Sequence, residues 1–137
     1  MKITVVDGQG GKLGKQIVER LCRVFTEAEI VAIGTNSLAT STMLKGGANA
    51  AATGENALVV ACRNSDVIVG PVGIVIADAL MGEITPRMAA AIGASDAFRI
   101  LLPVSKCNNY ISCASNSTVS EMIDDAVNKI TEMFLKA

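Results

Sequence analysis

A glycine-rich segment directly after a short apolar run constrains this chain more than any other feature. Residues 3–6 are Ile-Thr-Val-Val, and residues 7–14 are Asp-Gly-Gln-Gly-Gly-Lys-Leu-Gly. Residues 12–25 then show the periodicity of an amphipathic helix, so the pattern predicts a strand, a turn and a helix. Glycines let the backbone of such a turn approach a ligand, and the helix N-terminus offers N–H groups to a phosphate. We therefore predict a site for a phosphate-bearing ligand that uses Gly8, Gln9, Gly10, Gly11 and Gly14.

Known glycine-rich motifs fit this loop only in part. Three residues separate Gly10 from Gly14, which is a spaced-out variant of the dinucleotide-binding motif. The phosphate loop of nucleoside triphosphatases would need a glycine at position 9 and Ser or Thr at position 16, and both are Gln. A flavodoxin-like flavin site would need a run of Ser and Thr that the loop lacks. A plain turn would need fewer than the four glycines found in residues 8–14, because each glycine costs conformational entropy.

The remaining pattern predicts alternating strands and helices. We expect helices over 38–45, 86–92 and 120–135, and a loop or weak helix over 49–56. We also expect a helix to start after Gly70, followed by an apolar segment over 74–81. Strands are expected over 29–33, 57–61, 66–70 and 99–104, with one more edge strand around 110–113. Strands that are apolar on both faces are typical of a covered parallel sheet. The prediction is an α/β fold, a three-layer, doubly wound and mainly parallel Rossmann-like sheet, as a single domain over residues 1–137.

Three more polar loops are expected at the carboxyl edge of this sheet, where ligands bind in open α/β folds. The first contains Thr35 and Asn36, at the place where a dinucleotide-binding domain has an acidic residue that binds the ribose 2′-hydroxyl. No Arg that could bind a phosphorylated ribose is found there either. The other two cover residues 70–73 and 105–109. We add Thr35, Asn36, Gly70, Pro71 and Gly73 to the predicted ligand-binding residues. The cofactor is left open, with NADP or another nucleotide as candidates.

No catalytic residue is assigned from the sequence. Glu55 and Glu83 are the carboxylates best placed for acid–base chemistry, although solvated loop charges explain them equally well. Cys107 follows Lys106, which would lower the pKa of its thiol, but the chain has no His to act as a base. Cys107 and Cys113 are close enough in sequence to form a disulfide, but their spacing alone does not predict one. Whether the protein is an enzyme is therefore left open.

Composition excludes several classes of partner. The 12 basic and 13 acidic residues form no basic cluster, and with one Tyr and no Trp the chain lacks the charge and stacking groups typical of nucleic-acid binding. No stretch reaches the roughly 18 apolar residues of a membrane span, and no signal peptide is expected, so we predict no membrane partner and a cytoplasmic location. Without His, the four cysteines give no zinc-ligand spacing, and no metal is expected.

Six short motifs together resemble those of an uncharacterised bacterial family of short stand-alone Rossmann-like proteins, found mostly in anaerobes. The motifs cover residues 7–11, 34–41, 46–49, 52–56, 70–73 and 82–86. The likeness extends over nearly the whole chain. It implies a Rossmann-like domain and no catalytic role, because the family is one of unknown function.

The sequence favours a nucleotide- or dinucleotide-binding module that holds a small phosphate-bearing ligand. Two alternatives stay open: a small NAD(P)-dependent oxidoreductase whose site is completed by oligomerisation, and a structural or interaction protein with a degenerate site. Half of the residues are hydrophobic, and mean hydropathy is +0.44. We therefore expect a homo-oligomer, formed through residues 74–81 or the C-terminal helix.

Overall fold

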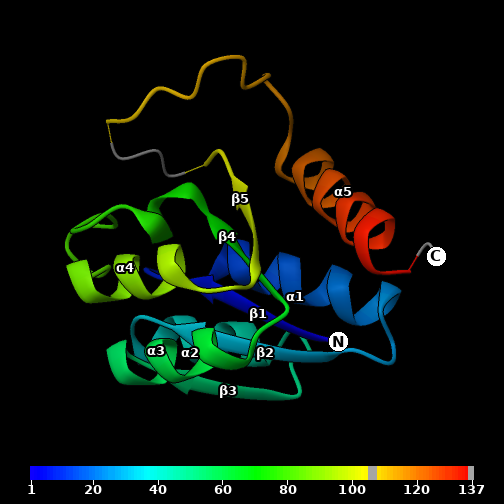
Figure 1. Cartoon of the computed structure of the whole chain (residues 1–137), viewed down its shortest axis with the longest axis horizontal. Helices are drawn as coiled ribbons and strands as arrows, with labels where there is room; N and C mark the ends of the chain where they lie inside the picture. The colour runs from blue at the N-terminus through cyan, green and yellow to red at the C-terminus, as the bar shows by residue number, and fades with distance from the viewer. Residues whose placement is uncertain (105–107, 136–137) are drawn as a thin grey trace.

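The computed structural model describes residues 1–104 and 108–135, and within them a parallel sheet of five strands forms the centre of the molecule (Figure 1). The strand order is β3-β2-β1-β4-β5. The strands are β1 (Lys2–Asp7), β2 (Glu29–Gly34), β3 (Ala50–Thr53), β4 (Val67–Pro71) and β5 (Phe98–Leu102). The helices are α1 (Lys12–Val24), α2 (Ser37–Leu44), α3 (Glu55–Asn64), α4 (Pro86–Ala94) and α5 (Val119–Ile130), with a 3-10 turn η1 (Val72–Val75) and a π-helical turn η2 (Thr131–Leu135).

Two hydrophobic cores, one on each face of the sheet, make the three layers. On one face α1, α2 and α5 pack through residues such as Ile17, Met43 and Ile123. On the other face α3 and α4 pack through residues such as Leu58 and Met88. The central strand β1 contributes to both cores, because alternate side chains of a strand point to opposite faces. The predicted doubly wound, Rossmann-like α/β fold is confirmed.

The ends of the strands place the polar loops together. β1 pairs with β2 so that Asp7 lies beside Gly34, and β2 pairs with β3 so that Gly34 lies beside Thr53. β1 also pairs with β4 on its other side, and the chain therefore reverses its direction of winding between β1 and β4. Ligands of open parallel sheets bind at this kind of reversal, beyond the carboxyl ends of the strands. The glycine loop that follows β1 stands at that point.

Several predicted elements are wrong. Residues 57–61 form no strand, since they lie inside helix α3, whose buried residues Leu58, Ala61 and Cys62 have helical spacing. Residues 49–56 contain strand β3 and the start of α3 in place of a loop or weak helix. The helix expected to start after Gly70 is only the short turn η1, and the rest of the apolar 74–81 segment continues as turns. Residues 110–113 contain no strand.

The part of the chain ahead of α5 that the structure describes, residues 108–118, lies on the β5 side of the sheet (Figure 1). It leads into α5, which packs against α1 and is tied to it by an ion pair between Arg20 and Asp124. Among the helices of the described residues, none combines the length and the apolar character that a membrane crossing requires.

Candidate functional site

The glycine loop makes a tight turn between β1 and α1. Gln9 and Gly11 have φ angles of 50° and 75°, and the Gly11 N–H donates to the Gly8 carbonyl at 3.0 Å. Gly11 is the N-cap residue of α1 and has no side chain to cap it. The loop therefore turns the chain straight into the helix and leaves the first helical N–H groups open at the sheet edge.

Three of the four loop glycines are required by the packing of the fold. A Cβ atom on Gly11 would lie 2.7 Å from the Ala39 backbone, and one on Gly14 would lie 2.4 Å from the Met43 sulfur, so both glycines let α2 approach α1. A Cβ on Gly8 would lie 2.7 Å from Thr35 Oγ1. At Gly10, in contrast, a Cβ would meet no atom within 4 Å, and its φ lies outside the left-handed region.

The open face of this loop is a donor-rich hollow. A cavity of about 400 Å³ is lined by residues 7–13. Within the described residues, the backbone N–H groups of Gly10, Lys12 and Leu13 make no hydrogen bond. Lys12 is exposed and adds a positive charge to the rim. Free N–H groups at a helix N-terminus, together with a cation, are typical of a site that accepts an anion.

Asp7, the last residue of β1, closes the inner side of the loop. Its carboxylate accepts the N–H of Gly8 and the N–H of Gly14, each at 2.8 Å. Burial raises the pKa of the Asp7 carboxyl and the nearby Glu83 charge raises it further, although the two backbone hydrogen bonds act in the opposite direction. Asp7 thus occupies one N–H of the α1 N-terminus and fixes the path of the loop.

The loop after β2 lies beside the glycine loop, as predicted. Thr35 N–H donates to the Asp7 carbonyl at 3.1 Å. Asn36 caps α2, because its Oδ1 accepts the Ala39 N–H at 2.8 Å, and its Nδ2 donates to the Gln9 carbonyl at 3.0 Å. The two predicted residues Thr35 and Asn36 therefore bridge the ends of β1 and β2.

Glu83 joins this group from a distant part of the chain. Its Oε1 accepts hydrogen bonds from Thr35 Oγ1 at 2.5 Å, Asn36 Nδ2 at 2.8 Å and Gln9 N at 2.9 Å. Burial would raise the pKa of the Glu83 carboxyl, but these three hydrogen bonds outweigh it and lower the pKa. The side chain is therefore an anion at neutral pH, which does not suit a general acid.

The loop after β4 is largely buried. Gly70, Pro71 and Gly73 are all buried, and Pro71 has no N–H. A Cβ on Gly70 would lie 2.5 Å from the Val6 carbonyl, which explains this glycine by packing. The helix start expected after Gly70 is the short turn η1. A ligand-binding role for Gly70, Pro71 and Gly73 stays a prediction.

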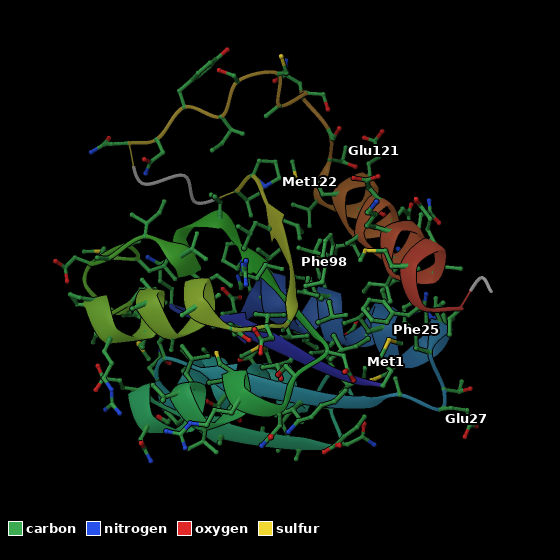
Figure 2. The ribbon with its side chains drawn as sticks, in the orientation of Figure 1. Met1, Phe25, Glu27, Phe98, Glu121 and Met122 are labelled. Carbon is green, nitrogen blue, oxygen red and sulfur yellow. The ribbon has the colours of Figure 1, made fainter. Side chains whose placement is uncertain are left out.

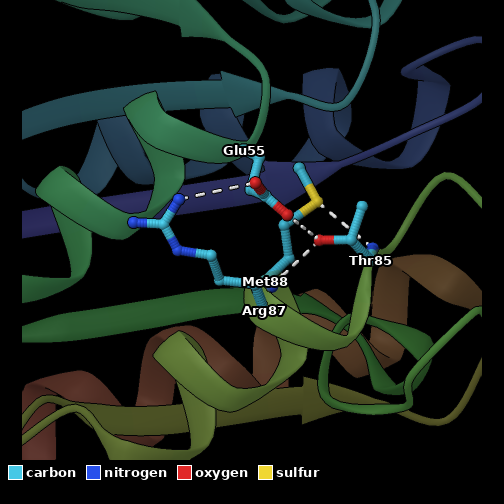
Figure 3. Close-up of polar contacts among 4 residues, drawn as sticks. All are labelled: Glu55, Thr85, Arg87 and Met88. Atoms are coloured by element: carbon cyan, nitrogen blue, oxygen red, sulfur yellow. Dashed lines mark hydrogen bonds and ion pairs between the residues drawn. The ribbon is translucent and has the colours of Figure 1, made fainter.

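Glu55 lies at the same edge but serves the joint between α3 and α4 (Figure 3). It accepts a hydrogen bond from Thr85 Oγ1 at 2.5 Å and pairs with Arg87 at 3.5 Å. Thr85 in turn caps α4 through the Met88 N–H at 3.1 Å. These contacts give Glu55 a structural role.

The cysteine hypotheses are left without structural support. Lys106 and Cys107 lie outside the described residues, and Cys113 is exposed. Burial raises the pKa of the Cys62 thiol, and likewise that of Cys22, which makes both less reactive. Over residues 1–104 and 108–135, no group of three or more His, Cys, Asp or Glu side chains could hold a metal ion.

The strand order, the helices on both faces and the glycine turn after β1 define an α/β protein with a Rossmann-like fold. Residues 2–135 match the model of a family described as "Domain of unknown function (DUF3842)", and the chain belongs to that family. The expected membership of an uncharacterised family is thereby confirmed.

Other comparisons add little. No curated protein matches the chain in sequence. The crystal structure of a nucleoside-diphosphate-sugar epimerase from Pseudomonas aeruginosa is similar over 94% of this chain, with 14% identity and a TM-score of 0.45. The match covers 46% of the epimerase chain, so this protein spans less than half of that length.

Proposed function

We propose that the protein is a nucleotide-binding module whose glycine loop holds the phosphate groups of the ligand. The observation that supports this most directly is Gly10. Neither its φ nor its surroundings require a glycine, since a Cβ there would meet nothing within 4 Å. A glycine without a packing reason is explained where a ligand must approach the backbone closely.

The donor groups around Gly10 support the same proposal. The N–H groups of Gly10, Lys12 and Leu13 face no partner within the described residues, and the cavity beside them, of about 400 Å³, has room for a phosphate chain. The partial positive charge of the α1 N-terminus and the Lys12 ammonium both favour an anion. A diphosphate would satisfy these donors without displacing Asp7 from Gly8 and Gly14.

ADP is a suitable probe, because it combines a diphosphate with a free ribose. We expect native mass spectrometry and calorimetric titration to show one ADP bound per chain. Gly10→Val places a branched side chain in the approach path, and we expect it to weaken ADP binding by about tenfold or more, since contact with the backbone is lost.

Gly93→Val is the matched control. Gly93 lies near the C-terminal end of α4, and a Cβ there also meets nothing within 4 Å. Both variants are expected to unfold at similar denaturant concentrations, and only Gly10→Val should lose ADP. If the wild-type protein does not bind ADP, or Gly10→Val binds it equally well, the proposal is wrong.

A further inference from the structure

The arrangement around Glu83 supplies the carboxylate that the end of β2 lacks. In Rossmann-like domains, an acidic residue at the end of the second strand accepts the hydroxyl groups of a nucleotide ribose. Here that position holds Thr35 and Asn36, and both side chains donate to Oε1 of Glu83. The Gln9 N–H, from the glycine loop itself, completes the set. One carboxylate oxygen is thereby fixed between the ends of β1 and β2.

The second oxygen of this carboxylate is free to accept from a ligand. Within the described residues no hydrogen bond or ion pair to Glu83 Oε2 occurs. Oε1 lies 3.0 Å from the place that a Cβ on Gly8 would take, so the carboxylate stands directly beside the glycine loop. A ribose carried by phosphates on this loop would come within reach of it.

The segment that positions Glu83 is strained and firmly anchored. Leu80, Met81 and Gly82 have consecutive φ angles of 55°, 56° and 88°, a left-handed run that costs L residues free energy. Leu80, the first residue of this run, and Ile84, two residues beyond its end, are buried, and the Ile84 N–H donates to the Ala79 carbonyl at 3.1 Å. Because buried side chains hold this strained segment in place, the Glu83 carboxylate is preorganised, and a ligand would not easily displace it.

We propose that Glu83 accepts a hydrogen bond from the ribose 2′-hydroxyl of the bound nucleotide and thereby selects nucleotides that lack a 2′-phosphate. This inference rests on the proposed function. The Thr35 and Asn36 side chains already donate to Glu83, so they are not free to bind a 2′-phosphate. The negative charge of the Glu83 carboxylate would also repel that phosphate. Arg87, in the first turn of α4, is paired with Glu55. NADP is therefore a poorer ligand for this site than NAD or an unphosphorylated mononucleotide.

Three probes that differ only at the ribose 2′ position test the inference by calorimetric titration: ADP, 2′-deoxy-ADP and ADP carrying a 2′-phosphate. For the wild-type protein we expect ADP to bind about tenfold more tightly than the deoxy probe, because a hydrogen bond to a charged group is lost. We expect a discrimination at least as large against the 2′-phosphate. This comparison uses the natural protein, so it holds even where a variant fails to fold.

Glu83→Gln removes the charge and keeps the size of the side chain, and Asp78→Asn is the matched control. Asp78 lies in the same segment, and Asn tolerates its φ of 65°. We expect the preference for ADP over the 2′-phosphate probe to fall toward one in Glu83→Gln and to persist in Asp78→Asn.

Each other result is informative. Equal or tighter wild-type binding of the 2′-phosphate probe, or a preference that survives in Glu83→Gln, overturns the inference and leaves the proposed function standing. Tighter binding of all probes by Glu83→Gln would identify the carboxylate as an occupant that the ligand must displace, and also overturns it. Absence of binding by any probe overturns the proposed function together with the inference.

Discussion

At the scale of single residues, Gly10 and Gly11 are neighbours with opposite structural roles. Gly11→Ala would force a Cβ to within 2.7 Å of the Ala39 backbone at a φ of 75°. We expect it to lower the free energy of unfolding by about 2–4 kcal/mol, from backbone strain and overpacking together. Gly10→Ala introduces neither backbone strain nor overpacking, and it should change the free energy of unfolding by less than about 0.5 kcal/mol. Urea unfolding of both variants measures this difference, and equal losses would mean that the fold itself requires Gly10.

The Glu83 network makes stability depend on pH in a defined direction. Because the folded protein lowers the pKa of the Glu83 carboxyl, the charged form adds stability above its ordinary pKa of about 4.3 and loses it as the pH falls through the lowered value. We expect Glu83→Gln to be less stable than the wild-type protein by about 1 kcal/mol at neutral pH.

The difference in unfolding free energy between the wild-type protein and Glu83→Gln should shrink to near zero in acid. Asp7 titrates in the opposite sense, because burial raises its pKa; it is present in both proteins, and the Glu83 charge is the smallest of the causes that shift its pKa. Denaturant unfolding of the pair from neutral pH down to about pH 3, below the ordinary carboxyl range, provides the measurement. A difference that stays constant over that range would show that the three hydrogen bonds do not favour the charged carboxylate.

These residues also show how far the site could be predicted from the sequence. The loop residues Gly8 to Gly14 and the pair Thr35 and Asn36 follow strands directly, so the rule about strand ends placed them together correctly. Glu83 was recognised only as a carboxylate near a helix break. Its partner Gln9 lies 74 positions away. Only the packing of Leu80 and Ile84 brings it to the loop, and no local pattern encodes that approach.

At the scale of elements, a hydrogen bond from Thr85 to Glu55 links α4 to α3, beside the apolar core that the two helices share. Thr85 caps α4 and donates to Glu55 at the start of α3 (Figure 3). We expect Thr85→Ala to lower the free energy of unfolding by about 1–2 kcal/mol, from the lost cap. In a double-mutant cycle with Glu55→Ala the two losses should not add, because each variant removes the hydrogen bond from Thr85 Oγ1 to Glu55.

Thr118→Ala provides the control for that cycle. Thr118 caps α5 through the Glu121 N–H at 3.2 Å and makes no hydrogen bond to Glu55. The loss of unfolding free energy in Thr118→Ala should therefore add to the loss in Glu55→Ala. Additive losses in the Thr85 and Glu55 cycle as well would mean that the hydrogen bond between these two side chains contributes nothing to stability.

The errors in the predicted elements have a common physical cause. The sequence of residues 57–61, Ala-Leu-Val-Val-Ala, is apolar throughout, and such a short run fits a buried strand or a helix equally well. Its neighbour β3 is rich in alanine, which has little strand preference, and it forms because β2 offers an edge for pairing. Long periodic segments such as α1 and α5 were predicted well, because their burial pattern alone identifies them.

At the scale of the whole molecule, the two ends of the sheet differ in character. The carboxyl edge carries the polar loops, whereas the opposite end exposes apolar side chains. Met1, Val24 and Leu135 border one hollow there, and Phe98, Met133 and Phe134 border another, so η2 joins the two. Figure 2 shows Met1 and Phe25 at the same end of the molecule as the C-terminal end of α5. The second hollow is also lined by Asp66, Asp96 and Arg99, so the exposed apolar side chains gather on η2 and around Met1. Exposed apolar clusters of this kind are typical of an interface.

Two regions are proposed as the contact surface of the expected homo-oligomer, and they differ in how far their apolar side chains are exposed. In the 74–81 segment Ile74 and Leu80 are buried in the chain's own core, which leaves mainly Met81 exposed, at 94%. In η2, Met133, Phe134 and Leu135 are 40–58% exposed. We therefore expect self-association through the C-terminal segment, where burial of these side chains would supply the driving force.

Phe134→Asp and Met81→Asp test this by sedimentation of each variant beside the wild-type protein. We expect an oligomer that Phe134→Asp converts to a monomer, because a charge would be buried without a partner, and that Met81→Asp leaves intact. A wild-type monomer at every accessible concentration would contradict the expectation, and so would dissociation by Met81→Asp alone. Since the apolar end lies opposite the glycine loop, the monomeric variant should still bind ADP. Loss of ADP on dissociation would instead favour a site that a second subunit completes.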